Sequence, residues 1–185
     1  MKTTFSFAAT LAATLACTPL WAAPPQIPPP DASEMTLQAT VPNFRRPREH
    51  LITGGQPEAS AWSTLSAQGV TTVINLRPQG EMGERDEASE VTRAGMVYRQ
   101  IPVADAGDIT EAKARELWTL LQQNKGDVLV HCSSGNRVGA LLAVGAATAG
   151  GMAPEAALDL GRRAGLRAAE PRVQELLGLV PPPAD

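Results

Sequence analysis

Residues 127–138 read DVLVHCSSGNRV, and this stretch decides the fold of the chain. Its apolar start, Val128-Leu129-Val130, predicts a buried strand that ends near His131. The Ala- and Gly-rich residues 138–149 predict a helix that is buried on most sides. A short polar loop over residues 132–137 joins the two elements. In parallel α/β sheets, ligands bind at strand-to-helix junctions of this kind.

Strands and helices alternate along the rest of the chain. We expect strands at 51–53, 70–76, 96–103 and 127–131 and helices at 57–68, 84–94, 110–124, 138–149, 154–164 and 170–179. This order predicts an α/β fold with a mostly parallel central sheet flanked by helices. A single domain over residues 41–180 would hold all of these elements.

The composition limits the classes of protein to which the chain can belong. It has 185 residues, with 16 Lys and Arg against 19 Asp and Glu, so its net charge of −3 argues against a nucleic-acid partner. Hydrophobic residues make up 43% and aromatic residues 4%, which predicts an aliphatic core. If Cys17 is removed with a leader peptide, one Cys and two His remain, which are too few for a four-ligand zinc site without carboxylates, and we expect neither metal nor cofactor.

The N-terminal residues resemble an export signal. Residues 1–22 combine Lys2, an apolar stretch over 5–15 and small residues before a cleavage point after Ala22, which predicts a signal peptide. The sequence TLAC before and at Cys17 is a loose lipobox, so a lipid anchor at Cys17 is the alternative. Both readings predict a periplasmic or secreted protein without a transmembrane segment in the mature chain. Residues 23–40 have five prolines among their first eight residues and predict an extended linker, and Pro181–Pro183 predict a similar tail.

The loop at Cys132 carries the chemistry. A helix N-terminus favours bound anions, and it also favours the thiolate form of Cys132. Ser133, Ser134 and Gly135 are small, so backbone N–H groups can approach a ligand closely. The planar fork of Arg137 suits phosphate oxygens. The loop therefore predicts a nucleophile in an oxyanion cradle with an arginine clamp. An inert, buried cysteine in a tight turn is the alternative.

The pattern His-Cys-x-x-Gly-x-Arg at residues 131–137 resembles the active-site loop of the cysteine-dependent protein tyrosine phosphatase superfamily. Further blocks at 43–44, 53–57, 69–77, 95–98 and 101–103 resemble the bacterial beta-lactamase-hydrolase-like, DUF442-type phosphatase-like family. The resemblance implies a dual-specificity-phosphatase-like domain that hydrolyses phosphate monoesters of a protein or small molecule through a phosphocysteine. It implies that His131 orders the loop and that phosphate is bound by Ser133, Ser134, Gly135, Asn136, Arg137 and Val138.

The resemblance also implies a general acid that protonates the leaving oxygen. Asp105 follows the expected strand and is our choice, while Asp108 is a nearby alternative that would otherwise cap the helix at Thr110. Arg77, at the end of another strand, would help to shape the pocket.

Two departures from the superfamily pattern leave other functions open. Four residues separate Cys132 from Arg137, where the superfamily has five, and rhodanese-like sulfurtransferases also use a short loop. Val138 stands where many phosphatases have a Ser or Thr whose hydroxyl stabilises the leaving thiolate. The alternatives are therefore a sulfurtransferase that carries a persulfide on Cys132 and a non-catalytic module that binds anions.

Overall fold

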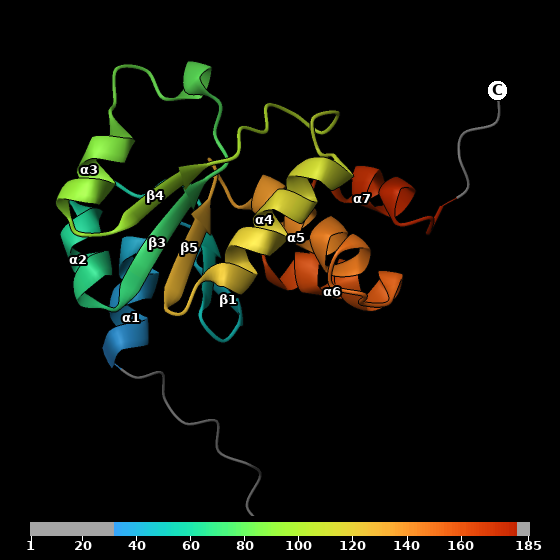
Figure 1. The fold of residues 1–185 in the computed structure, drawn as a ribbon, viewed down its shortest axis with the longest axis horizontal. Helices are drawn as coiled ribbons and strands as arrows, with labels where there is room; N and C mark the ends of the chain where they lie inside the picture. Colours follow the sequence, from blue (N-terminus) through green and yellow to red (C-terminus); the bar gives the residue numbers. More distant parts are fainter. Residues whose placement is uncertain (1–31, 181–185) are drawn as a thin grey trace, which may run out of the picture.

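A five-stranded sheet runs through the centre of the computed structural model, which describes residues 32–180 (Figure 1). The strands are β1 (Arg45–Arg48), β2 (Leu51–Gly54), β3 (Val70–Asn75), β4 (Val97–Gln100) and β5 (Asp127–His131). They lie in the order β1-β2-β5-β3-β4, and β1 alone runs antiparallel to its neighbour, β2. The predicted mostly parallel α/β sheet is confirmed.

The register brings the ends of three strands together at one edge of the sheet. His131 at the end of β5 lies opposite Gly54 of β2 on one side and opposite Asn75 of β3 on the other. Because the strands are parallel, the segments that follow these residues all leave from the same edge. The Cys132 loop therefore starts at the middle of this edge, between the segments that begin at Gly55 and Leu76.

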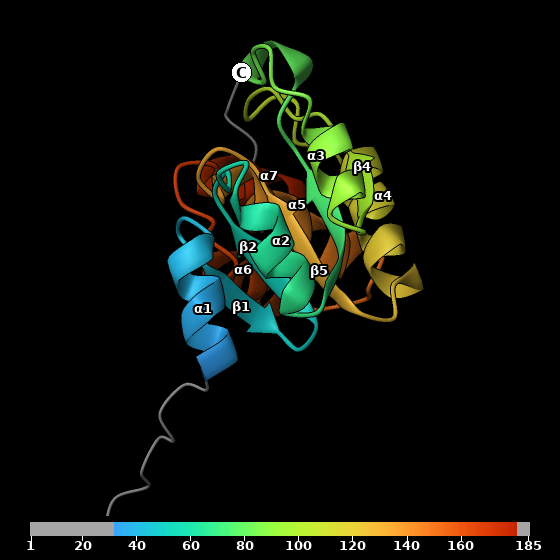
Figure 2. The ribbon, with the colours of Figure 1, turned by 90° about the vertical axis from the view of Figure 1, so that its left-hand side faces the viewer.

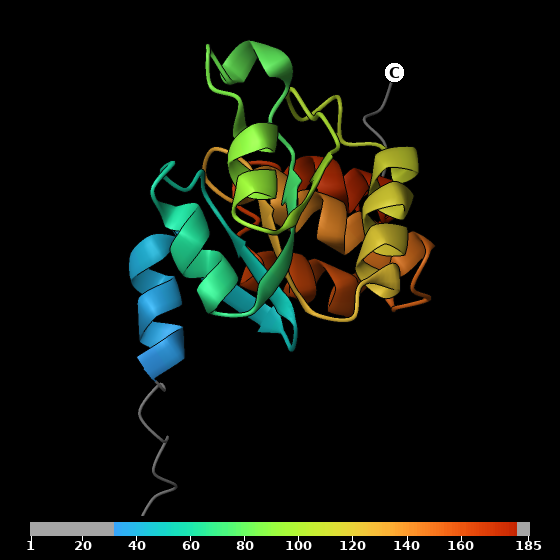
Figure 3. The ribbon, with the colours of Figure 1, turned by 60° about the vertical axis from the view of Figure 1, so that its left-hand side comes forward.

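Helices cover both faces of the sheet (Figures 1 and 2). One layer holds α1 (Ala32–Thr40), α2 (Ala61–Ala67) and α3 (Glu87–Arg93). The other holds α4 (Glu111–Gln123), α5 (Asn136–Thr148), α6 (Pro154–Arg163) and α7 (Glu170–Leu176). Figure 3 shows that the chain between β3 and α3, which includes the short 3₁₀ helix η1 (Gln79–Glu81), projects beyond the end of the sheet.

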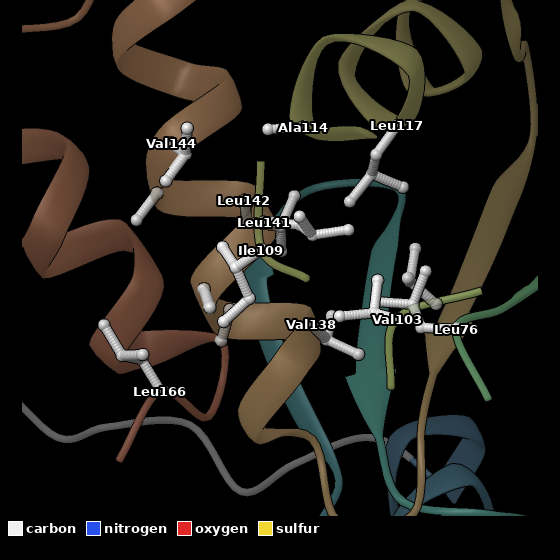
Figure 4. Close-up of a cluster of buried hydrophobic side chains, with 14 of the residues drawn as sticks. Leu76, Val103, Ile109, Ala114, Leu117, Val138, Leu141, Leu142, Val144 and Leu166 are labelled. Carbon is white, nitrogen blue, oxygen red and sulfur yellow. The ribbon is translucent and has the colours of Figure 1, made fainter. Parts of the chain in front are cut away.

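The core is aliphatic, as the composition predicts. Strand residues alternate between its two halves: Ile74 and Val130 pack toward α5, whereas Val73 and Leu129 pack toward α2. Helix α5 is buried on nearly every side and forms the centre of its layer. In Figure 4 its residue Val138 lies beside Val103 and Leu76, with Leu141 and Leu142 toward α4. This packing fixes the N-terminus of α5, and with it the Cys132 loop.

Two elements were not predicted from the sequence. The predicted extended linker is wrong from residue 32 onward, because α1 forms there and buries Leu37 against Trp62 of α2. Strand β1 was not predicted, because its sequence, RRPR, is charged and has no apolar pattern. Its Pro47 is tolerated because β1 is an edge strand. The predicted signal peptide 1–22, the lipobox at Cys17, the linker up to residue 31 and the tail 181–183 lie outside the described residues.

Two predicted helices begin later than expected. Helix α2 starts at Ala61 rather than at residue 57, because residues 56–60 form an irregular segment. Helix α3 starts at Glu87 rather than at residue 84, because the carboxylate of Asp86 accepts a hydrogen bond from the backbone N–H of Ser89 and caps it. Within residues 32–180, no helix is both long and apolar enough to cross a membrane.

Candidate active site

The loop between β5 and α5 wraps around the sulfur of Cys132. Gly135 adopts φ 95°, in the left-handed region that favours glycine, and this turn starts α5 at Asn136. The turn aims the backbone N–H of Gly135 at the Sγ atom of Cys132, with a distance of 3.0 Å. The sulfur thus lies at the N-terminus of a 13-residue helix, where the unpaired N–H groups favour negative charge.

The segment after β2 supports the loop from one side. The carbonyl of Gly54 accepts a hydrogen bond from the backbone N–H of Cys132 at 3.3 Å, and Gly55 forms a bridge with Ser134. A Cβ atom on Gly55 would lie 2.8 Å from the carbonyl oxygen of Ser133, so only glycine permits this approach. Asn43 also donates from Nδ2 to the carbonyl of Ser134 at 3.3 Å. The sequence blocks at 43–44 and 53–57 therefore both contact the loop.

Arg137 folds back over the loop and is held by four hydrogen bonds. Its Nη1 donates to Oε1 of Glu81 at 2.7 Å and to the carbonyl of Val103 at 2.6 Å. Its Nη2 donates to Oε2 of Glu81 at 2.8 Å and to Oγ of Ser133 at 2.9 Å. A guanidinium has five N–H groups, so these bonds use the four terminal ones and leave Nε–H. A phosphate oxygen can replace the Ser133 hydroxyl at Nη2 and bind together with Nε–H.

The Glu81–Arg137 pair is reflected in the pKa of both groups. The hydrogen bond from Arg137 lowers the pKa of Glu81, and Arg77 contributes in the same direction. The hydrogen bond to Glu81 raises the pKa of Arg137, and the Cys132 sulfur adds to this effect. Glu81 therefore stays ionised and keeps the Arg137 fork in a fixed orientation.

A cavity of about 290 Å³ opens in front of the loop. Ser133, Ser134, Asn136 and Arg137 form one wall, and the remaining lining residues are Ala104, Asp105, Ala106, Ile109, Ala168 and Ala169. Cys132 does not line this cavity and is fully buried. A substrate in the cavity therefore reaches the sulfur only if the loop residues around Cys132 move.

The two candidate acids lie in different surroundings. Asp108 forms an ion pair with Lys113 and accepts a hydrogen bond from the backbone N–H of Ala104 at 2.9 Å, and the Lys113 contact lowers its pKa. Asp105 lines the cavity and accepts one hydrogen bond, from the backbone N–H of Asp108 at 3.2 Å. Asp108 thus stabilises the loop, and Asp105 faces the space that a substrate would fill.

His131 does not line the cavity and instead forms a buried contact with Glu87 that the sequence did not indicate. Its Nε2 lies 2.9 Å from Oε1 of Glu87, and both side chains are fully buried. Burial raises the pKa of Glu87, but the hydrogen bond and charge of His131 outweigh it, helped by Gln56 and Arg85, so the pKa lies below its ordinary value. Glu87 belongs to a polar stretch, and its position at the first turn of α3 was its one sequence signal.

Two further residues of the predicted phosphate site, Asn136 and Val138, use their side chains to stabilise the fold. Asn136 accepts hydrogen bonds through Oδ1 from the backbone N–H groups of Arg167 and Ala169, at 2.8 and 3.2 Å, and so ties α5 to the segment before α7. The side chain of Val138 is fully buried in the core and does not line the cavity. Among residues 32–180, no cluster of three His, Cys, Asp or Glu side chains could hold a metal ion.

Comparison with known proteins identifies the family. The sequence model of the family described as "Polymorphic toxin system, DSP-PTPase phosphatase" matches residues 50–150, more than half of the chain. The chain belongs to this family. The matched region contains the Cys132 loop, the Glu81 segment and both candidate acids. The fold is therefore that of the cysteine-dependent phosphatases.

Curated relatives are longer proteins. A beta-lactamase hydrolase-like protein of Agrobacterium fabrum is 36% identical over 124 residues, which are 65% of this chain. The corresponding protein of Xylella fastidiosa is 37% identical over 93 residues, which are 48% of this chain. The chain spans only 28% and 21% of the length of these two relatives.

Solved structures have the same fold. A DUF442 protein of Shewanella putrefaciens superposes with a TM-score of 0.64 at 28% identity, over 78% of this chain and 94% of that one. TpbA of P. aeruginosa gives a TM-score of 0.57 at 23% identity, over 77% of this chain and 94% of that one. The predicted resemblance to the tyrosine phosphatase superfamily is confirmed.

Proposed function

We propose that the chain is a cysteine-dependent phosphatase that hydrolyses phosphate monoesters through a phosphocysteine intermediate. The observation that carries this proposal is the placement of the Cys132 sulfur at the N-terminus of α5, under the fork of Arg137. Backbone N–H groups and a guanidinium stabilise the charge that develops on the phosphoryl oxygens during transfer. This arrangement suits phosphoryl transfer to sulfur, and the family membership of the chain supports it.

The reaction we propose has two steps. In the first, the Cys132 thiolate attacks phosphorus, the ester P–O bond breaks, and the acid form of Asp105 gives its proton to the leaving oxygen. In the second, the Asp105 carboxylate takes a proton from water, which attacks the phosphocysteine and releases phosphate and the thiolate. Arg137 would hold two phosphoryl oxygens through Nε–H and Nη2–H in both steps.

The test is phosphate release from p-nitrophenyl phosphate under reducing conditions. Wild type is expected to turn over, Cys132→Ser to be inactive, and Asp105→Asn to lose about 10²- to 10⁴-fold in kcat. The matched control, Asp108→Asn, removes the other candidate acid and should keep most of the activity. Wild-type inactivity, or a Cys132→Ser variant that still turns over, would refute the proposal. Thiosulfate cyanolysis with a persulfide on Cys132 would select the sulfurtransferase instead.

A second candidate function is supported by Val138. The valine side chain is fully buried among apolar neighbours and offers no hydrogen bond to the leaving thiolate. Release of the phosphocysteine should then be slow, and a chain that binds phosphate without turnover is the limiting case. A rapid burst of p-nitrophenol followed by slow turnover would indicate slow release, whereas binding without a burst would indicate a binding module.

The location and the substrate are also proposals. The sequence signal at residues 1–22 supports export to the periplasm or the outside of the cell, with a lipid anchor at Cys17 as the alternative. The mass of the mature N-terminus separates these outcomes. The substrate is a phosphorylated protein or small molecule that fits a cavity of about 290 Å³.

A further inference from the structure

Residues from four separate segments form a continuous chain of hydrogen bonds behind the active-site loop. It begins at His131, whose Nε2 lies 2.9 Å from Glu87, and continues from Glu87 to Nε2 of Gln56 at 2.5 Å. The Oε1 atom of Gln56 then accepts a hydrogen bond from Nη1 of Arg77. Arg77 in turn contacts Glu81, through a hydrogen bond to its carbonyl and an ion pair of 3.5 Å to its carboxylate.

This series of hydrogen bonds ends at Arg137 of the loop, because Glu81 accepts a hydrogen bond from each terminal nitrogen of Arg137. One end of the chain is thus the residue directly before Cys132, and the other is the clamp that closes the loop. His131 and Arg137, which flank the loop of Cys132 in the sequence, are thus held by one connected set of contacts.

In the hydrogen bonds from His131 to Arg77, the chemistry of the side chains determines which group donates and which accepts. Arg77 can only donate, so the amide oxygen of Gln56 must face it and the amide nitrogen must face Glu87. Glu87 therefore receives one donor from Gln56 and one from His131, and only a group with two acceptors satisfies both. A glutamine at position 87 would place its own N–H₂ against one of these donors.

Burial makes this arrangement hard to replace by water. The side chains of Glu87 and His131 are fully buried, and within residues 32–180 the Nδ1 atom of His131 has no hydrogen-bond partner. The carboxylate is thus the sole hydrogen-bond partner of the imidazole in the described part of the chain. The other charged or titratable groups near Glu87 are Arg85, from the segment before α3, and Tyr98 of β4.

We infer that Glu87 and Gln56 are positioning residues. They act through His131 and Arg77 to hold the two ends of the Cys132 loop in fixed positions relative to each other. Neither side chain lines the cavity, so neither touches the substrate. This inference rests on the proposed function, since it assigns these residues to the same reaction. It predicts that the activity depends on the pattern of donors and acceptors at positions 56 and 87, beyond the mere presence of polar side chains.

The test is a cycle of three variants. In Glu87→Gln, the new amide N–H₂ group faces a donor, either the amide of Gln56 or the ring N–H of His131. In Gln56→Glu, the new carboxylate faces the carboxylate of Glu87. The double variant Gln56→Glu/Glu87→Gln restores the three bonds that link Arg77, position 56, position 87 and His131, because the carboxylate at 56 accepts from Arg77 and from the amide at 87, whose oxygen accepts from His131. It loses the hydrogen bond from Nε2 of Gln56 to the carbonyl of Pro57, at 3.1 Å, in common with the single variant Gln56→Glu. The matched control is Glu90→Gln, on the same helix, where the carboxylate contacts Trp62 and Arg85 rather than the loop.

Two measurements are made on the full chain. The first is kcat and KM for p-nitrophenyl phosphate. We expect each single variant to lose about tenfold to a hundredfold in kcat with a smaller change in KM, as expected when a reacting group is displaced by about 1 Å. The double variant should recover most of this loss, and Glu90→Gln should stay within about threefold of wild type.

The second measurement does not require turnover. Alkylation of Cys132 by iodoacetate, an anion that can occupy the cradle, is followed by mass spectrometry of the peptide that contains Cys132. We expect slower alkylation in both single variants and recovery in the double variant. Failure of recovery in both assays, with melting temperatures equal to wild type, would overturn the inference. If wild type has no phosphatase activity but the alkylation cycle shows recovery, the proposed function fails and the positioning role stands.

Discussion

Replacing Glu81 by glutamine tests whether the carboxylate helps or hinders the bound phosphate. Glu81 accepts one hydrogen bond from each terminal nitrogen of Arg137, at 2.7 and 2.8 Å. Glutamine keeps one acceptor oxygen, so one of the two bonds is lost. A hydrogen bond to a charged group contributes about 1.5–3 kcal/mol. The side chain of Glu81 is 34% exposed, so water compensates in part and we use the lower value, about 1.5 kcal/mol.

A loss of this size corresponds to about a tenfold decrease in kcat/KM for p-nitrophenyl phosphate. Glu84→Gln is the matched control, because Glu84 is an exposed carboxylate in the same projecting segment. Phosphate affinity from isothermal titration calorimetry, which needs no turnover, should fall by a similar factor. The opposite outcome is also informative: if Glu81→Gln raises kcat/KM, repulsion between the carboxylate and the substrate dominates, and the idea that Glu81 orients the fork is wrong.

Three further predictions concern stability and access. The pKa of Glu87 lies below its ordinary value in the folded chain, so ionised Glu87 stabilises the fold above about pH 4.5. This contribution is lost as the pH falls below that value. The unfolding free energy of Glu87→Gln, measured with urea, should therefore depend less on pH between about pH 5 and 3 than that of wild type. Gly135→Ala should lower the unfolding free energy by about 1–2 kcal/mol, because φ 95° strains any residue with a Cβ, and a melting temperature equal to wild type would contradict this. Ser133→Ala frees one N–H of Arg137, so inhibition by phosphate should strengthen by about threefold to tenfold, and weaker inhibition would show that the hydroxyl itself binds phosphate.

The parts of the site that lie close together in sequence could be predicted. The strand β5, the loop and the helix α5 are contiguous, and each has a local signal: aliphatic residues, Gly135 and an Ala-rich stretch. Glu87 was missed, because a polar stretch does not indicate which of its side chains faces inward. Its partner His131 is 44 residues away, and only the folded sheet brings the two together.

The choice between Asp105 and Asp108 shows the same limit. Both lie in one loop, and the sequence offered the position after a strand for Asp105 and a capping role for Asp108. The contact of Asp108 with Lys113 depends on how the loop folds against the start of α4. Helix α1 was missed for a different reason, because the prolines up to residue 30 dominated the composition of its surroundings, and Leu37 gives little signal until Trp62 is placed beside it.

The projecting segment between β3 and α3 is an exposed part of the support of Arg137, because its Glu81 holds both terminal nitrogens of that side chain. A proteolytic cut beside η1 would leave the core and Cys132 intact, but the carboxylate of Glu81 would no longer be held in place beside Arg137. A protein that binds this segment and moves Glu81 would change how Arg137 is held, while buried helix α5 stays in place.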